Sequence, residues 1–512
     1  MSTPGNTQRI AKNTIYLYIR SLFSLFVSLY SSRLILQALG ADDYGTYNVV
    51  GGFVSMFWLV SGSLSTAVTR FLNFEKGRDD SERVGNVFSL SLNLMLLLSL
   101  AVLLLAESFG LWFFHHQMNI PAGRETAAFW VFQFSVLTVM SGFAVVPFNS
   151  AIIANEKMGI YAYLGIAESI MRLLVALVLT FCHLSADKLI IYALLWMIAT
   201  FLLQGSAILF CRRNFEECRF RRFFERGLFK EMFSFAGWSF LESIAGTFSG
   251  QGVNVMLNIF FGTVVNAARG LAGTVNNAVS IFVNNFIMAL NPQITQSYAS
   301  GDLGYLKSLV FRGTKFSFFI LIFFAIPLFL ETPFVLHLWL GEVPEHTANF
   351  VRLTLIISVI DLHGGIFNMA QKATGDIRTI QIWLSLSTLS IFPLSYVALK
   401  CGLSPEYVYL VSILVSLLKV CVILITVCKK LSFSMREILA TVYLKMDIVT
   451  LLSLPIPILC HIMLPEGWWR LVAVTASSIV FIACFVWSIG STKIERATLL
   501  NHLLKKLNVG GQ

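Results

Sequence analysis

The stretch VGNVFSLSLNLMLLLSLAVLLLA, at residues 84–106, contains no charged side chain. The hydrocarbon core of a bilayer is about 30 Å thick and is crossed by about 20 apolar residues of helix. The stretch has 23 residues, so it is long enough to cross that core. We therefore expect a membrane-spanning helix here, and similar runs elsewhere decide how often the chain crosses the membrane.

The whole chain is apolar to the same degree. Of its 512 residues, 56% are hydrophobic and 12% are charged, whereas soluble proteins carry about 25% charged residues. This balance excludes a soluble enzyme, a disordered chain and a secreted disulfide scaffold. Fourteen runs are long and apolar enough to span a bilayer, so the sequence predicts an all-α polytopic membrane protein with about 14 transmembrane helices. The runs cover residues 14–38, 44–69, 84–107, 126–150, 160–182, 189–211, 233–261, 267–290, 316–340, 350–371, 379–400, 407–428, 447–464 and 470–489.

Basic residues alternate between the connections of these spans. With the N-terminus in the cytoplasm, 27 of the 37 Lys and Arg residues fall on cytoplasmic segments and six on the other side. Since basic loops stay on the cytoplasmic side, we expect a bacterial inner-membrane protein with both termini in the cytoplasm. The net charge of +10 lies in short connections and not on one basic face, so nucleic acid is not an expected partner.

The connection at residues 212–230 divides the spans into two halves of six. It holds seven basic residues, which either anchor the chain on anionic lipid or grip a phosphate ligand. Residues 34–52 and 256–274 align at an offset of 222, and repeated halves with a site between them are common in transporters. The predicted organisation is an N-terminal lobe at 1–211, a basic cytoplasmic linker at 212–231, a C-terminal lobe at 232–428, and helices 13 and 14 with a cytoplasmic tail at 429–512.

The first span carries two arginines. A charged side chain in mid-membrane costs at least about 2.5–3.5 kcal/mol, so it should face a cavity or a partner. Arg20 and Ser24 fall on one helical face, which we expect to line a substrate-binding cavity. Arg33 lies about 220° further round the helix, so a straight helix cannot direct both arginines into one cavity. Arg33 either reaches the cavity through a bend or extends to the outer interface.

The second, seventh and eighth spans have polar faces. Asn48 belongs to a row of small and polar residues that serves either close helix packing or a cavity wall. The seventh and eighth spans carry more amides than packing requires, so we expect them to border a water-filled lumen. Their candidate substrate-binding residues are Gln251, Asn254, Arg269, Asn276, Asn277 and Asn284. The first two spans of both halves are thus predicted to line a central cavity.

Three charged residues in the fifth and seventh spans are candidates for coupling or gating. Glu168 and Arg172 stand four residues apart with the glutamate first, which is the favoured order for an intrahelical ion pair. They form either a structural pair or a part of the transport cycle. Glu242, in the seventh span, is a further group whose protonation could reset that cycle.

A second acid and base lie in the tenth and twelfth spans. Asp361 and Lys419 either pair with each other or bind a coupling ion. Because Gly364–Gly365 follows Asp361 closely, we expect the helix to break there.

Motifs of catalysis are lacking in the sequence. His115 and His116 are neighbours, whereas zinc ligation from one helix face requires i, i+4 spacing. No P-loop is present, and the longest outer connection, at 108–125, is too short for a sugar-transfer site. We therefore expect a protein that is not an enzyme and has no metal or cofactor, with H⁺ or Na⁺ as the open choice of coupling ion.

Two segments resemble a known family. The stretch AKNTIYLYIRSLFSLFVSLYSSRLILQALGADDYGTYNVVGGF, at residues 11–53, contains an LG–x3–YG–x–Y turn, and NPQITQSYASGD follows at residues 291–302. Both resemble Wzx-type polysaccharide-biosynthesis flippases of the MOP exporter superfamily, which are related to lipid II flippases and MATE transporters. The resemblance covers essentially the whole chain.

The resemblance implies a fold of two six-helix lobes in a V shape plus two C-terminal helices. It implies transport of an undecaprenyl-diphosphate-linked oligosaccharide from the cytoplasmic to the periplasmic leaflet by alternating access, for O-antigen or capsule assembly. In lipid II flippases, arginines of the first and eighth helices engage the diphosphate. Arg20 and Arg269 match these by helix and face, and Arg33 by helix alone. The last two helices would hold the lipid tail.

The implied partners are the lipid-linked glycan, the bilayer and the polysaccharide polymerase machinery. Two alternatives remain. A cation-coupled MATE-type multidrug antiporter would need an acid-lined cavity, which the basic excess near the first and eighth spans disfavours. A membrane glycan polymerase would need a large outer loop.

Overall fold

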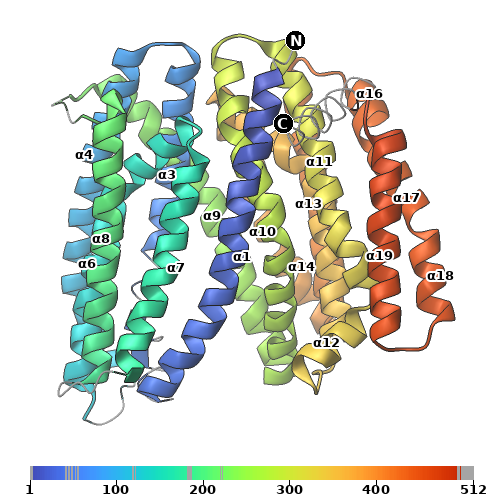
Figure 1. Ribbon diagram of the computed structural model, residues 1–512, viewed down its shortest axis with the longest axis horizontal. Coiled ribbons are helices and arrows are strands. Elements are labelled where there is room, and N and C mark those ends of the chain that lie inside the picture. Colours follow the sequence, from blue (N-terminus) through green and yellow to red (C-terminus); the bar gives the residue numbers. More distant parts are fainter. Residues whose placement is uncertain are drawn as a thin grey trace, which may run out of the picture. The chain divides into compact units, whose positions relative to one another are not determined.

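The computed structural model describes residues 4–40, 43, 46–47, 50–51, 54, 57–117, 120, 123–181, 187–219, 221, 223–492 and 496. Within these ranges all regular secondary structure is helical. The chain divides into two compact units, Arg9–Phe240 and Leu241–Gln512 with Met1–Gln8, which we call the N-terminal and C-terminal units. The division falls inside one helix, α9, and each unit is a bundle of helices that run up and down (Figure 1). The prediction of an all-α polytopic membrane protein is confirmed.

The helices of the N-terminal unit follow one another through short connections. Their bounds are α1 (Pro4–Leu39), α3 (Trp58–Gly77), α4 (Ser81–Leu105), α5 (Leu111–Gln117), α6 (Glu125–Ala154), α7 (Met158–Phe181), α8 (Lys188–Asn214) and α9 (Arg226–Phe261). A π-helical turn at Ala106–Gly110 joins α4 to α5, and a short 3₁₀ turn at Glu216–Cys218 follows α8.

The C-terminal unit begins within α9 and contains the remaining helices. Their bounds are α10 (Thr263–Ala299), α11 (Leu303–Leu330), α12 (Thr332–Leu340), α13 (Thr347–Thr374), α14 (Arg378–Lys400), α15 (Tyr407–Leu431), α16 (Met435–Ile438), α17 (Leu444–Ser453), α18 (Pro455–Met463) and α19 (Trp468–Phe485). π-Helical turns lie at Leu439–Tyr443, before α17, and at Val486–Gly490, after α19.

Eleven helical segments of the described chain are long and apolar enough to cross a membrane. Helices α3, α9 and α10 are outside that set. They correspond to the second, seventh and eighth predicted spans, in which glycine, serine and asparagine reduce the apolar character. Since α9 and α10 have 36 and 37 residues, they are long enough to cross. With these three helices the chain has about 14 transmembrane helices, as the sequence predicts.

One end of the N-terminal unit gathers the connections that the sequence assigns to the cytoplasm. The Lys76 ammonium lies 2.7 Å from the Glu217 carboxylate, and Asn155 donates a 3.0 Å hydrogen bond to the same group. Arg9 pairs with Glu156 at 2.5 Å. Connections far apart in the sequence therefore meet where the predicted topology requires them to meet.

The opposite end of this unit is held by Arg124, at the start of α6. Its guanidinium pairs with both Asp43 and Asp187, so one arginine joins three connections. Burial raises the pKa of Asp187, but the Arg124 guanidinium and the Leu189 backbone amide outweigh burial and hold that pKa below its ordinary value.

The last two membrane crossings pack against α11 of the C-terminal unit. Their buried contact is a cluster of apolar side chains that includes Phe318, Phe319, Val442, Met446, Val449 and Ile482. Glu331, which directly follows α11, has no solvent exposure, and its carboxylate lies 2.7 Å from His461 and 3.1 Å from Arg470. Apolar packing and a buried charge cluster thus both attach α17, α18 and α19 to this unit.

The predicted helix break at Gly364–Gly365 is wrong. Helix α13 runs without interruption from Thr347 to Thr374. A Cβ atom at Gly364 would lie 2.9 Å from Cδ1 of Ile423 on α15. The glycine is needed for close packing of the two helices, which a sequence pattern cannot distinguish from a break.

Candidate functional site

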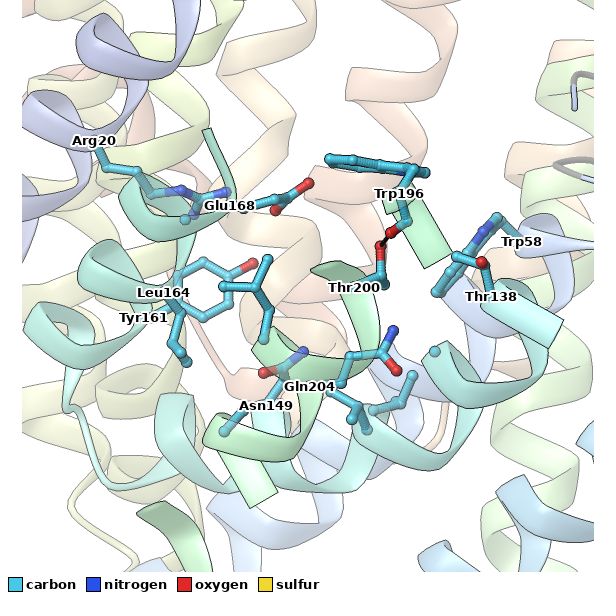
Figure 2. A pocket seen from close by; sticks show the side chains of 16 residues that line it. Arg20, Trp58, Thr138, Asn149, Tyr161, Leu164, Glu168, Trp196, Thr200 and Gln204 are labelled. Carbon is cyan, nitrogen blue, oxygen red and sulfur yellow. Dashed lines mark hydrogen bonds between the residues drawn. The ribbon is translucent and has the colours of Figure 1, made fainter. Parts of the chain in front are cut away.

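A cavity of about 400 Å³ opens among α1, α3, α6, α7 and α8 of the N-terminal unit. Its volume is within the range of small-molecule sites, about 300–1,000 Å³. Arg20 enters from one side of the view in Figure 2 and Trp58 from the other, with the amides of Asn149 and Gln204 in the lower part. The other lining residues are Thr138, Gly142, Val145, Val146, Tyr161, Leu164, Gly165, Glu168, Trp196, Thr200, Leu203 and Ala207.

The position of Arg20 in this cavity depends on the Tyr161 ring and on Gly165, which has no side chain. Its guanidinium carbon lies 4.6 Å from the centroid of the Tyr161 ring, a cation–π contact. A Cβ atom at Gly165 would lie 2.2 Å from Nε of Arg20. The arginine therefore occupies the space that any other residue at position 165 would fill. The sequence prediction that Arg20 faces a cavity agrees with this arrangement.

Glu168 lines the same cavity and gives it a negative charge. It lies 3.8 Å from Arg172, so the predicted intrahelical pair is present, and Arg172 lies 4.8 Å from the Trp196 ring centroid. The pair is loose, and the Glu168 side chain is 52% exposed. The carboxylate is therefore accessible to an ion or a ligand in the cavity.

The other N-terminal candidates have different surroundings. Ser24 accepts a 2.7 Å hydrogen bond from Ser169, so its hydroxyl joins α1 to α7. Arg33 is exposed, and Asn48 lies outside the described residues.

Sequence reasoning missed the neutral lining of the cavity. Asn149 on α6 and Gln204 on α8 are amides within otherwise apolar spans, and that isolation was a usable signal. Trp58 gave no such signal, because its place depends on a partner distant in the sequence. A Cβ atom at Gly142 would lie 2.3 Å from Cη2 of Trp58, so the glycine makes room for the indole.

The C-terminal unit holds its own intramembrane arginine. Nε of Arg269 donates a 2.6 Å hydrogen bond to Oδ1 of Asn254, which in turn donates a 3.1 Å bond to Gln251. The Arg269 guanidinium carbon lies 5.8 Å from the Tyr409 ring centroid. Three predicted substrate-binding residues thus form one connected chain on α9 and α10.

The remaining candidates on α10 are less connected. Asn276 accepts a 2.7 Å hydrogen bond from Ser358 on α13, so it joins two helices. Asn277 and Asn284 are exposed.

The charged coupling candidates of this unit are all paired. Asp361 lies 3.5 Å from Lys419, which is one of the two arrangements that the sequence left open. Glu242 lies 2.8 Å from Lys372. The Asp361 side chain is still 45% exposed, so the pair is not sealed from its surroundings.

One curated relative matches this chain over part of its length. The uncharacterized membrane protein EpsK of Bacillus subtilis strain 168 is 24% identical over 347 residues, which are 62% of this chain and 63% of EpsK. The chain thus matches less than two thirds of that relative's length.

Two solved structures of MOP superfamily transporters share the fold. A multidrug resistance MATE family transporter in an outward-facing conformation has a TM-score of 0.70 and 13% identity, over 83% of this chain and 96% of that one. A MOP superfamily transporter from Pyrococcus furiosus, whose binding pocket of reverse polarity is described as suggesting a different function, has a TM-score of 0.71 and 12% identity with the same coverage. Likeness at such identity shows the fold alone.

The sequence itself matches a family model over residues 10–298, more than half of the chain. That model describes polysaccharide biosynthesis proteins. The chain therefore belongs to the polysaccharide biosynthesis protein family, and its membrane-spanning bundle has the fold of these two solved structures.

Proposed function

We propose that the protein is a flippase for undecaprenyl-diphosphate-linked oligosaccharides. It moves them from the cytoplasmic to the periplasmic leaflet of a bacterial inner membrane by alternating access, for assembly of a surface polysaccharide such as O-antigen or capsule. The observation that carries this proposal is the cavity of the N-terminal unit, in which Arg20 shares a membrane-embedded wall with aromatic rings and neutral amides.

The arginines supply charge for the diphosphate. A guanidinium binds phosphate oxygens through paired, charge-assisted hydrogen bonds, which are stronger than bonds between neutral groups. The bond from Arg269 to Asn254 uses one of its five N–H donors and fixes the plane of the group. The Tyr161 ring fixes Arg20 without using any donor. Both arginines can therefore present an oriented guanidinium to an anion.

The rest of the cavity suits a sugar. Asn149 and Gln204 offer hydrogen-bond donors and acceptors to hydroxyl groups, and Trp58 and Trp196 offer flat apolar faces to the ring. The lipid tail remains in the bilayer, so the protein needs to enclose only the polar part. Glu168, beside Arg20 in the cavity, is the proposed site at which H⁺ or Na⁺ binding resets the transporter.

The test is export of labelled lipid-linked glycan in cells that carry Arg20→Ala or Arg269→Ala. Either change should reduce delivery to the outer leaflet at least tenfold, about the effect of losing one charge-assisted hydrogen bond. Arg436→Ala, which changes an exposed arginine on α16, is the matched control and should export normally. Undiminished surface polysaccharide in both cavity variants would refute the proposal.

A strain in which the gene is deleted separates the alternatives. A flippase defect leaves the lipid-linked intermediate in the cytoplasmic leaflet, whereas a polymerase defect leaves it in the periplasmic leaflet. Increased drug sensitivity with normal surface polysaccharide would identify a multidrug antiporter instead.

A further inference from the structure

The N-terminal unit contains a second cavity, of about 440 Å³, that the proposed transport cycle does not use. It lies where α3 ends and where α4 and α9 begin. It shares no lining residue with the cavity that holds Arg20. The ligand of this second cavity must therefore be inferred from its own lining residues.

The charged side chains around this second cavity balance. Three arginines and three glutamates line it, so their formal charges cancel. They are Arg70, Arg78, Arg83, Glu75, Glu225 and Glu231. A purely anionic ligand would meet three carboxylates here, and a purely cationic ligand would meet three guanidinium groups.

Aromatic rings fix two of the arginines. The guanidinium carbon of Arg70 lies 4.6 Å from the ring centroids of both Phe71 and Phe74, and that of Arg78 lies 4.4 Å from Phe74. Such cation–π contacts orient a guanidinium without neutralising it. The positive side of the cavity is therefore preorganised.

Four of these six charged side chains do not pair directly with one another. Within the described part of the chain, Arg78, Arg83, Glu225 and Glu231 form no ion pair. Glu75 is 6% exposed, and its Oε2 has no hydrogen-bond partner among the described residues. A buried carboxylate is costly unless a cation or donors compensate it. Glu75 therefore has room for a donor or a cation, and the four exposed side chains are accessible to a ligand that carries both charges.

The level of the cavity in the membrane indicates where that ligand comes from. The membrane-spanning segment that contains α4 begins at Ser81, so Arg83 lies within its first turn. The ends of spans lie at the level of lipid headgroups. Pockets with basic side chains at this level bind lipid phosphate.

We propose that this cavity binds the zwitterionic headgroup of phosphatidylethanolamine. Its phosphate accepts hydrogen bonds from Arg78 and Arg83, its ammonium donates to Glu225 and Glu231, and its acyl chains stay in the bilayer. The balanced charge favours this lipid over the anionic lipid that the basic sequence of residues 212–230 alone suggests. The proposal does not depend on the transported substrate.

The test is native mass spectrometry of the full-length protein in detergent, with three lipids of identical acyl chains. Phosphatidylethanolamine should stay bound at low excess. Phosphatidylcholine, whose trimethylammonium group has no N–H donor, and phosphatidylglycerol, which has no cation, should each bind about tenfold more weakly, as expected for one lost charge-assisted hydrogen bond. Soluble phosphoethanolamine at the same concentration should not compete.

Matched variants locate the site. Arg83→Ala and Glu231→Gln both change exposed side chains, so we expect the variants to fold, and each should weaken retention of phosphatidylethanolamine about tenfold. Arg436→Ala on α16, outside the cavity, should retain it fully. Equal or stronger binding of phosphatidylglycerol or phosphatidylcholine, competition by phosphoethanolamine, unchanged retention in both variants, or no bound lipid would each overturn the proposal. None of these readouts depends on glycan export.

Discussion

The two units each place an arginine inside the membrane, but they hold it by different means. In the N-terminal unit, Arg20 lies on the Tyr161 ring and fills the space left by Gly165. In the C-terminal unit, Arg269 is fixed by its hydrogen bond to Asn254, and its aromatic neighbour is more distant. The first arginine is positioned by shape and the second by a bond. This difference predicts which neighbouring substitutions disable each one.

The largest effect is expected from Gly165→Ala. The added methyl group would lie 2.2 Å from Nε of Arg20, so the arginine must leave its place. Overpacking of this kind costs about 1–3 kcal/mol, and we expect glycan export to fall at least as far as in Arg20→Ala. Gly205→Ala on α8, where a Cβ atom would meet nothing within 4 Å, is the control. Normal export by Gly165→Ala would show that the position of Arg20 is not important.

A similar but smaller effect is expected from Asn254→Leu. The variant removes the hydrogen bond to Arg269, and a bond to a charged group contributes about 1.5–3 kcal/mol. Because Arg269 keeps its charge, we expect the lower end of this range, a fall in export of about tenfold, with Asn258→Leu on the same helix as the control. An Asn254→Ala variant should behave like Asn254→Leu, since both lack the acceptor. If shape were what holds Arg269, the two variants would differ.

Sequence reasoning succeeded where the signal is local and failed where it is not. Hydropathy predicts the spans, and charge predicts which connections meet at the same end of the N-terminal unit. Helical spacing predicts the Glu168–Arg172 pair. The roles of Gly165 and Gly142 depend on Arg20 and Trp58, which approach from other helices. A glycine in a span is compatible with a break, a close contact or a space for a partner. Only the tertiary packing distinguishes these roles.

The acids of the two units should also differ in importance. Glu168 is only loosely paired, at 3.8 Å from Arg172, and lines the cavity beside Arg20. Asp361, in contrast, lies 3.5 Å from Lys419 and lines neither of the two cavities described above. We expect Glu168→Gln to lower export severalfold and to change its pH dependence. The Asp361→Asn/Lys419→Met double variant removes a balanced pair and should export nearly normally. A strong defect in the double variant, with normal export in Glu168→Gln, would move the coupling site to the C-terminal unit.

The smallest effect concerns Glu406, which precedes α15. Burial raises the pKa of this carboxyl, but hydrogen bonds from His346, Ser404 and Asn349 outweigh burial and lower the pKa to about 2. A carboxylate with a depressed pKa in the folded state stabilises the protein above its unfolded pKa, about 4.3, and this contribution is lost as the pH falls towards 2. The melting temperature of Glu406→Gln should therefore be lower than that of the wild type at pH 7. The difference should shrink below pH 4, and a constant difference would contradict the assignment.

The buried carboxylate of Glu331 has a consequence for how this architecture can evolve. Its partners His461 and Arg470 both belong to the last two membrane crossings, and it has no exposure to solvent. A shortened chain that ended before α17 would leave a charge stranded in an apolar environment, which is strongly destabilising. Loss of the last two crossings in a descendant would thus require replacement of Glu331 in the same lineage. The last two crossings are therefore an obligate part of the bundle as long as position 331 is a glutamate.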